Sequence, residues 1–415
     1  MILPNNRNNQ LAFIVLIALF ASIVIFRIVN LSADTPFGIS TGQELSTDPP
    51  QYTSFARNQA LFGNWEIYYT RYVFFVNNIT TLMAYPIFKI FGTGRAQSNF
   101  VATFFSLLTI FASFLIWRKK GYPFAIASTA ILGFNYIFIS YGKMTFLEVT
   151  TLGVASFAGF LLLCEKYRIL TSFLSGILFA AAAFYSKLLA VVFLPLALVI
   201  LLIELYQMKK PAIFKKFNPL YAFGIGYVVI FLLWLVTVYL PSKGEVSGYL
   251  SEISTGMYGA PKAFESVKMF FVQLFSYGFD SKLWAKQPIT FAIGFLGAAA
   301  VAGFLFSPKK EILQKIDRID LFNLLWFVGI FCTLFPWNYR PLRYALLIFP
   351  PMCYLATRWL FILSEPRNKW GKRIWPLYLF SLIAGAIVTF HLLINPHFDE
   401  RSLELVLKYI PFGIL

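Results

Sequence analysis

A few charged side chains stand beside long apolar runs, and their types suit proton transfer next to an anion. Two are acids and three are cations: Asp48, Glu148, Lys187, Arg340 and Arg343. A carboxylate can take the proton of an attacking hydroxyl group, and lysine or arginine can stabilise the negative charge that develops on a leaving phosphate. These residue types therefore suit the transfer of a group from a phosphate to a hydroxyl acceptor.

Both acids also have an ordinary structural explanation. Asp48 is followed by Pro49, Pro50 and Gln51, which is the pattern of a helix N-cap with a capping box. Glu148 stands at the mouth of an apolar run, where it would touch water or cap a helix. An acid at the end of a membrane span is also a default functional candidate. The residue types alone leave both explanations open.

The cations are open to two explanations as well. Lys187 lies between two long apolar runs with no charged neighbour in sequence, so it either snorkels to the membrane surface or serves the site. Arg340 and Arg343 are three apart and can face the same way on a helix, which suits bidentate binding of a phosphate. Pairing with lipid phosphates, or with Asp48 and Glu148, would suit them equally.

The elements that must position these residues are membrane spans. The 415-residue chain is 59% hydrophobic and 13% charged, and apolar runs of about 20 residues recur along it. This composition predicts one all-α polytopic membrane domain over residues 1–394, followed by a short tail at 395–415. About eleven spans are predicted, at 11–29, 97–117, 123–141, 146–164, 169–185, 188–206, 219–240, 288–306, 320–337, 342–363 and 374–394.

The segment 79–92 decides the orientation of every later span. It is apolar for only about 14 residues and contains Pro86 and Lys89, so it is short enough to lie in the interface. Residues 49–62 read as a second interfacial, amphipathic helix. If 79–92 did cross the membrane, the number of spans would rise to about twelve.

The basic clusters favour the arrangement in which 79–92 does not cross. Nearly all the clusters between spans, from Arg7 to Arg373, then fall on one side of the membrane, and that side is the cytoplasm. The N-terminus is therefore expected in the cytoplasm. Segments 30–96 and 242–287 and the tail 395–415 are expected outside, and the glycines of 242–287 predict a mobile loop that gates the site.

Other function classes fit the sequence less well. The formal charge of +17 does not point to nucleic acid, because the cations lie in short clusters between apolar runs, where anionic lipid headgroups would be. Two N-glycosylation patterns, at Asn30 and Asn78, lie close to the membrane. A transporter or lipid flippase is the rival class. Transporters place ionisable residues near the bilayer midplane, whereas the candidate residues of this chain stand beside or between the apolar runs.

Three motifs, in their order along the chain, resemble one family of membrane enzymes. They are Asp48-Pro49-Pro50-Gln51-Tyr52-Thr53-Ser54-Phe55-Ala56-Arg57 with Gly63-Asn64-Trp65, then Tyr141-Gly142-Lys143-Met144-Thr145-Phe146-Leu147-Glu148, then Arg343-Tyr344-Ala345-Leu346-Leu347-Ile348-Phe349-Pro350-Pro351. They are similar to motifs of the GT-C glycosyltransferases, in particular the protein O-mannosyltransferase and aminoarabinose transferase branch. The resemblance covers about residues 10–360.

The resemblance implies an inverting transfer of a monosaccharide from a polyprenyl-phosphate donor to a hydroxyl of a protein, lipid or glycan on the extracytoplasmic face. The membrane is expected to be the plasma membrane of a prokaryote rather than the endoplasmic reticulum. Asp48 would be the general base, and Glu148 a second acid that orients the acceptor or helps hold a divalent metal ion. Lys187, Arg340 and Arg343 would contact the donor phosphate. An O-antigen ligase or polymerase of GT-C type would use the same acids for a different donor.

The chain departs from the branch's pattern in the first outer loop. Pro49 stands where the branch usually has a glutamate after the aspartate, and its later proline-rich cationic element has no counterpart before Pro86. Arg71 is the candidate replacement for that cation at the donor phosphate. Tyr52, Trp65 and Tyr344 are the candidate contacts for the sugar or acceptor, although aromatic rings near a membrane surface also act as interfacial anchors.

Overall fold

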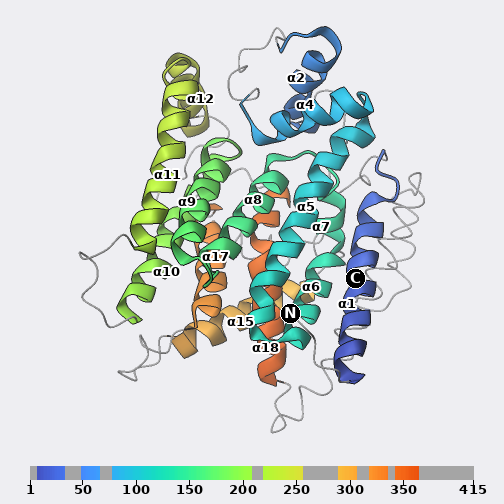
Figure 1. Ribbon diagram of the computed structural model, residues 1–415, viewed down its shortest axis with the longest axis vertical. Helices are drawn as coiled ribbons and strands as arrows, with labels where there is room; N and C mark the ends of the chain where they lie inside the picture. The colour runs from blue at the N-terminus through green and yellow to red at the C-terminus, as the bar shows by residue number, and fades with distance from the viewer. Residues whose placement is uncertain are drawn as a thin grey trace.

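The computed structural model of the chain describes residues 7–32, 48–65, 77–207, 218–255, 288–305, 317–334 and 342–363. Over these residues the protein is helical and contains no strand. Long helices stand side by side in a bundle, and α2 (Asp48–Phe62) and α4 (Ile79–Phe91) lie together at one end of it, shown at the top of Figure 1. That end is called the α4 end below.

The long helices of the bundle follow the predicted spans closely. They are α1 (Arg7–Ile28), α5 (Arg95–Trp117), α8 (Leu147–Leu162), α9 (Arg168–Phe184), α10 (Phe193–Gln207), α11 (Pro219–Trp234), α15 (Pro288–Leu305), α17 (Arg318–Leu334) and α18 (Phe349–Leu363). Helical turns extend several of them: η1 (Arg118–Lys120), η2 (Leu188–Val192), η3 (Leu235–Tyr239) and η4 (Leu342–Ile348). The predicted span at 374–394 and the tail at 395–415 lie outside the described residues.

Three of these helical stretches are long and apolar enough to cross a membrane unaided, within the part of the chain that the structure describes. They are Arg95–Lys120, Leu188–Gln207 and Pro219–Tyr239, with mean hydropathies of 2.1, 3.0 and 2.2. Six shorter apolar helices of 10–17 residues accompany them. The prediction of an all-α polytopic membrane fold is confirmed.

One predicted span, 123–141, is formed by two helices rather than one. It is divided into α6 (Tyr122–Gly133) and α7 (Tyr136–Tyr141). The break falls at Asn135, whose extended backbone and side-chain oxygen, 2.9 Å from the Phe138 backbone nitrogen, cap α7. Asparagine offers the backbone this local alternative to helix, which a count of apolar residues does not register.

The doubtful segment 79–92 is a short helix, as predicted. Helix α4 has 13 residues and contains Pro86. At 1.5 Å per residue a helix of this size is roughly 20 Å long, shorter than the hydrocarbon core of about 30 Å. It packs against α2, and the Thr81 hydroxyl donates to the Tyr52 carbonyl over 2.6 Å. The interfacial position of both helices stays a prediction.

The segment 242–287, predicted as a mobile loop, begins instead with a helix. Helix α12 covers Lys243–Thr255 and follows α11 after a turn closed by the Ser242 N–H, which donates to the Tyr239 carbonyl over 3.2 Å. Glu245 lies in the first turn of α12, where a negative charge stabilises a helix. The prediction relied on the glycines of 242–287 and on Pro261. Gly244 and Gly248 lie within α12, because isolated glycines lower helix stability without preventing a helix. Residues 256–287 lie outside the described part.

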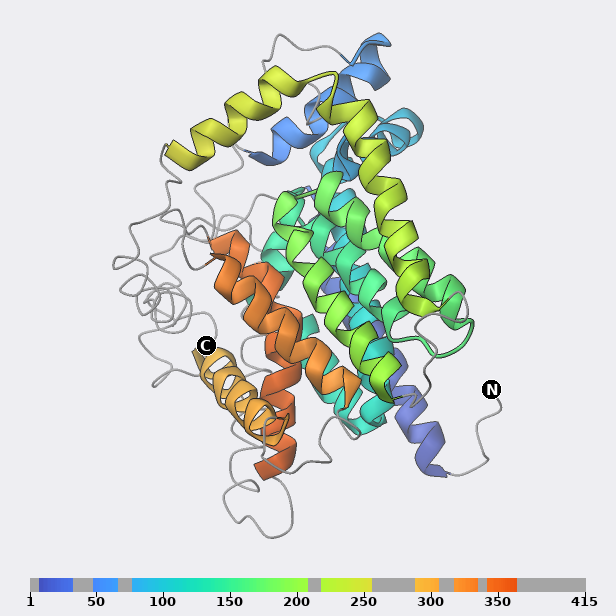
Figure 2. The same cartoon turned by 90° about the vertical axis from the view of Figure 1, so that its left-hand side faces the viewer.

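Small residues let several helices approach closely. A Cβ atom at Gly176 of α9 would lie 2.2 Å from the Phe223 carbonyl oxygen of α11, and one at Gly226 would lie 2.2 Å from the Phe173 carbonyl oxygen. Reciprocal glycines of this kind are how membrane helices pack backbone against backbone. In the perpendicular view of Figure 2, α15 and α18 also lie side by side, and Gly297 meets the Leu355 carbonyl.

The end of the bundle opposite α4 carries an ion-pair network. Lys120 pairs with Asp317 and, at 2.8 Å, with Asp320, while Glu204 accepts from Arg168 at 2.7 Å and from Arg318 at 3.1 Å. Burial alone would raise the pKa of Asp317, but its hydrogen bond with Lys120 and the lysine charge hold that pKa below the ordinary value. These ion pairs connect α10 with α9 and α17, and connect α17 with the turn that follows α5, all at this end of the bundle.

Candidate active site

Glu148 lies in the first turn of α8, at the α4 end of the bundle. Its helix begins after Phe146, which supplies no side-chain cap. Glu148 is 1% exposed. Its Oε1 atom accepts from the Lys187 Nζ and lies 3.4 Å from the Arg343 Nε. The structure thus brings together three residues that the sequence predicts separately.

Lys187 reaches Glu148 because the turn after α9 is fastened to α8. The Ser186 hydroxyl lies 2.7 Å from the Thr151 hydroxyl, and Thr151 is one helical turn beyond Glu148 on the same face of α8. The Lys187 N–H donates to the Ala182 carbonyl over 2.9 Å, which holds the turn on the end of α9. The lysine is therefore an internal partner of Glu148 and not a side chain that merely snorkels to the surface.

Arg343 and Tyr344 come from η4, which follows α17. The Trp326 indole donates to the Leu347 carbonyl over 2.9 Å and so fixes η4 on α17. The Lys187 Nζ lies 3.9 Å from the centre of the Tyr344 ring, and the Arg343 guanidinium lies 5.1 Å from that of Phe146. Cation–π contacts of this kind orient the two cations around the acid.

Glu148, Lys187 and Arg343 are called the cation cluster below. Two cations and one carboxylate carry one formal positive charge. The Lys187 and Arg343 side chains are 20% and 18% exposed, whereas that of Glu148 is 2% exposed. The acid is thus covered while both cations reach the surface. Partly exposed lysine and arginine side chains suit the binding of a phosphate.

Asp48 is the first residue of α2, one helical turn before Tyr52. Helix α2 is connected to the start of α8 by hydroxyl groups. The Thr53 hydroxyl lies 3.3 Å from that of Ser98 in α5, which lies 3.3 Å from that of Thr145, just before α8. The helix that begins with Asp48 is therefore fixed at the same end of the bundle as the cation cluster.

The remaining predicted site residues have different surroundings. Trp65 packs on Tyr85 of α4, with ring centres 5.2 Å apart, so it supports the α2 and α4 pair. Tyr344 is 8% exposed beneath Lys187. Tyr52 offers its carbonyl to Thr81. Arg71 and Arg340 lie outside the described residues, so their predicted contacts with a donor phosphate stay predictions.

Two buried cations near the site were not predicted as functional. Arg27, fully buried in α1, donates to the Ser106 hydroxyl and to the Gly133 carbonyl, both over 2.9 Å. Lys143, in the link before α8, donates to the Val29 carbonyl, and burial together with the Arg27 charge lowers the pKa of Lys143 to about 8. The sequence signal for these two cations was Arg27 itself, a single arginine inside an apolar run.

No group of three or more His, Cys, Asp or Glu side chains gathers as metal ligands within the described ranges. The carboxylate of Glu148 is engaged by two cations. The two histidines of the chain, His391 and His397, lie outside those ranges.

The fold is found in solved membrane enzymes. ArnT from Cupriavidus metallidurans, bound to undecaprenyl phosphate, matches with a TM-score of 0.60 at 15% identity over 95% of this chain and 72% of its own. The Archaeoglobus fulgidus oligosaccharyltransferase in complex with Zn and sulfate matches with a TM-score of 0.54 at 13% identity, over 96% of this chain and 56% of its own. No family model and no curated protein matches the sequence.

Both structural neighbours are glycosyltransferases of the GT-C fold. The chain therefore has the GT-C fold and is a polytopic membrane protein, as the motifs predict. It spans less than two thirds of the oligosaccharyltransferase. At these identities the likeness concerns the fold, so residue roles rest on the geometry of this chain.

Proposed function

We propose that the protein is a membrane glycosyltransferase that moves a monosaccharide from a polyprenyl-phosphate donor to a hydroxyl acceptor on the extracytoplasmic face. The observation that carries the proposal is the cation cluster, in which Lys187 and Arg343 share one oxygen of the buried Glu148. It lies at the same end of a GT-C bundle as the helix that begins with Asp48. The ArnT structure of similar fold is bound to undecaprenyl phosphate, and a structure of the Archaeoglobus fulgidus oligosaccharyltransferase is in complex with a dolichol phosphate.

The chemistry follows from the charges of these residues. Asp48 takes the proton of the acceptor hydroxyl as its oxygen bonds to the anomeric carbon. The bond from that carbon to the phosphate oxygen breaks, and its electron pair leaves with the lipid phosphate. Lys187 and Arg343 stabilise the charge that develops on this leaving group, through an oxocarbenium-like transition state. A single displacement inverts the configuration of the anomeric carbon.

The large apolar surface of the bundle fits a lipid donor. Leu188 and Val191, which follow Lys187, are 54% and 36% exposed. A polyprenyl chain that lies along such a surface would keep its phosphate at the end of the bundle, beside the cations. The acceptor class is left open: a protein, a lipid or a glycan hydroxyl would meet the same base.

The experiment that tests the proposal separates the base from the phosphate contacts. In the purified protein, Asp48→Asn is expected to lower sugar transfer from a polyprenyl-phosphate donor by about 10²- to 10⁴-fold, because proton transfer is lost. Binding of polyprenyl phosphate should persist. Lys187→Met should instead weaken the binding of polyprenyl phosphate, because one of the two cations that contact the phosphate is lost. Transfer would be measured with a radiolabelled sugar donor and binding by a titration in detergent micelles.

Glu245→Gln is the matched control, since Glu245 is also an acid in the first turn of a helix and is exposed. It should leave transfer and binding unchanged. Undiminished turnover in Asp48→Asn would remove Asp48 from the mechanism. Lipid transport across vesicles without any sugar transfer would favour a flippase and contradict the proposal.

A further inference from the structure

Asn78 stands where two parts of the site meet. Its side chain is 5% exposed and makes two hydrogen bonds. The oxygen accepts from the Thr80 N–H over 2.9 Å and caps α4, while the nitrogen donates to the Ser186 carbonyl over 3.1 Å. Because Ser186 precedes Lys187, this second bond joins the start of α4 to the lysine turn. A side chain so enclosed is a poor glycosylation acceptor, despite the sequence pattern at 78–80.

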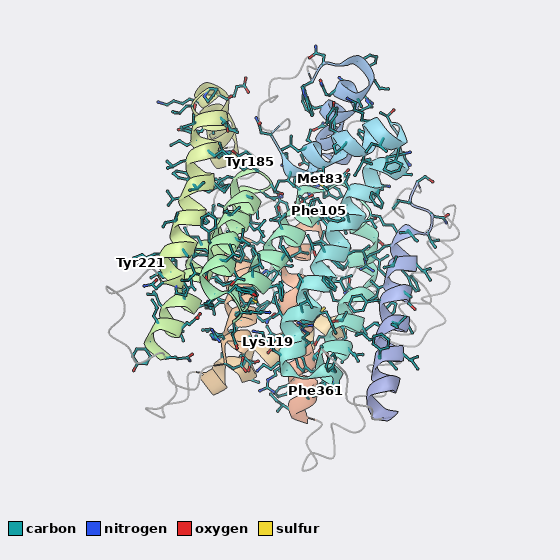
Figure 3. The ribbon with its side chains drawn as sticks, in the orientation of Figure 1. Met83, Phe105, Lys119, Tyr185, Tyr221 and Phe361 are labelled. Carbon is teal, nitrogen blue, oxygen red and sulfur yellow. The ribbon has the colours of Figure 1, made fainter. Side chains whose placement is uncertain are left out.

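Neighbouring bonds show that this junction is tight. The Ile79 N–H donates to the Tyr185 carbonyl over 2.8 Å, and the Thr80 and Thr150 hydroxyls are 2.7 Å apart. The start of α4 is thereby held to the turn after α9 and to the first turns of α8. In Figure 3, Met83 of α4 and Tyr185 lie at the same end of the bundle, far from Lys119.

The far side of α4 carries the acid-bearing helix. Thr81 donates to the Tyr52 carbonyl, and α2 packs along α4. A continuous path of contacts therefore runs from Lys187 through Ser186 and Asn78 to the helix that begins with Asp48. Lys187 and Asp48 come from distant parts of the sequence, so their separation depends on junctions of this kind.

We propose that Asn78 is a positioning residue that fixes the acid-bearing helix pair at the distance from the lysine turn that transfer requires. The inference rests on the proposed function. A base displaced by about 1 Å from its reacting hydroxyl can cost a factor of about 10² in rate. The two roles of Asn78 are separable, because the cap uses the side-chain oxygen and the tether uses the nitrogen.

The test replaces Asn78 with serine, which retains a good cap oxygen and removes the tethering nitrogen. Asn78→Ser should lower kcat for sugar transfer by roughly 10- to 100-fold. The affinity for polyprenyl phosphate should change less than about twofold, because the cation cluster is intact. A residue that served only as a helix cap would not produce this separation of kcat from phosphate affinity.

Asn218 provides the matched control. It caps α11 by accepting from the Leu220 and Tyr221 N–H groups over 3.0 and 3.1 Å. Its side-chain nitrogen is buried and has no hydrogen-bond partner among the residues that the structure describes. Asn218→Ser therefore removes the same atoms without breaking a tether. It should leave kcat unchanged.

A distance measurement completes the test without relying on activity. Spin labels at Arg57 of α2 and Leu188 of η2, both exposed, should give a narrow distance distribution in the parent protein and a broader one in Asn78→Ser. Equal kcat and equal distributions in Asn78→Ser and the parent would overturn the inference, as would a loss of phosphate affinity in step with kcat. Absence of transfer in the parent protein would instead contradict the proposed function, and the distances would still decide the role of Asn78.

Discussion

Glu148 shows how burial and pairing change the role expected of an acid. The resemblance to the GT-C family assigns it to the acceptor or to a metal, yet its side chain is 2% exposed and one oxygen faces both Lys187 and Arg343. A charge buried in this way is costly unless it is paired, and each cation compensates for it. We infer that Glu148 acts as a counter-ion that sets the charge and the direction of the two cations.

This role predicts a specific defect in Glu148→Gln. The substitution keeps the shape and raises the formal charge of the cation cluster by one, which should favour the dianionic product, polyprenyl phosphate, over the monoanionic donor. Product inhibition should become tighter by at least about tenfold, equivalent to ~1.4 kcal/mol, and kcat should fall as release slows. The measurement is the inhibition constant of polyprenyl phosphate in the transfer assay.

Glu148→Asp, which keeps the charge, is the companion variant and should shift product inhibition less. A loss of phosphate affinity in Glu148→Gln would show instead that the acid mainly holds the cations in place.

At the residue scale, the sequence identified members of the cluster but not their pairing. Lys187 has no charged neighbour along the chain because its partner, Glu148, lies 39 positions away. Arg343 was a candidate partner of Glu148 among several. The sequence around Asn78 showed only a glycosylation pattern. It could not predict the hydrogen bond to the Ser186 carbonyl, because Ser186 is distant along the chain.

At the scale of elements, apolar runs located most of the helices, whereas the breaks within and between them depend on polar contacts. The division of 123–141 at Asn135 follows from a side-chain cap, and Arg27 adds to it by binding the Gly133 carbonyl at the end of α6. Neither hydrogen bond changes the hydropathy of the segment, so hydropathy averaged over a sequence window cannot predict the break. Averaged hydropathy cannot predict the contact of α9 with α11 either, because that contact depends on where glycines of the two helices face each other.

Gly176 tests that contact. In Gly176→Ala the new Cβ would lie 2.2 Å from the Phe223 carbonyl oxygen, so α9 and α11 must move apart. Overpacking of this kind typically costs about 1–3 kcal/mol. The thermal midpoint of the purified protein in detergent should fall by several degrees, as followed by tryptophan fluorescence.

Gly224→Ala is the control within α11, because no atom of the described residues lies within 4 Å of its Cβ position. It should leave the midpoint unchanged or raise it slightly, since alanine is the better helix former. Equal midpoints for Gly176→Ala and Gly224→Ala would contradict the close packing of α9 on α11.

At the scale of the whole molecule, charged side chains gather at the two ends of the bundle. The cation cluster lies at the start of α8 and the end of α9. The Lys120–Asp317 and Glu204–Arg318 pairs lie at the opposite end, the end of the bundle at which Figure 3 labels Lys119. Glu204 of α10 is paired with Arg168 and Arg318 there. This distribution fits a bilayer between the ends and differs from the midplane charges typical of a transporter.

The basic clusters predict which end faces the cytoplasm. Residues 118–120 should lie there and α2 outside, because translocated segments carry few cations. In a background with Cys164, Cys332 and Cys353 replaced by serine, Tyr122→Cys should react with an impermeant maleimide only after the membrane is opened. Phe62→Cys, at a position that is 75% exposed in α2, should react on intact cells. Labelling of Tyr122→Cys from outside would place the cation cluster in the cytoplasm, where a donor sugar on the outer leaflet could not reach Lys187.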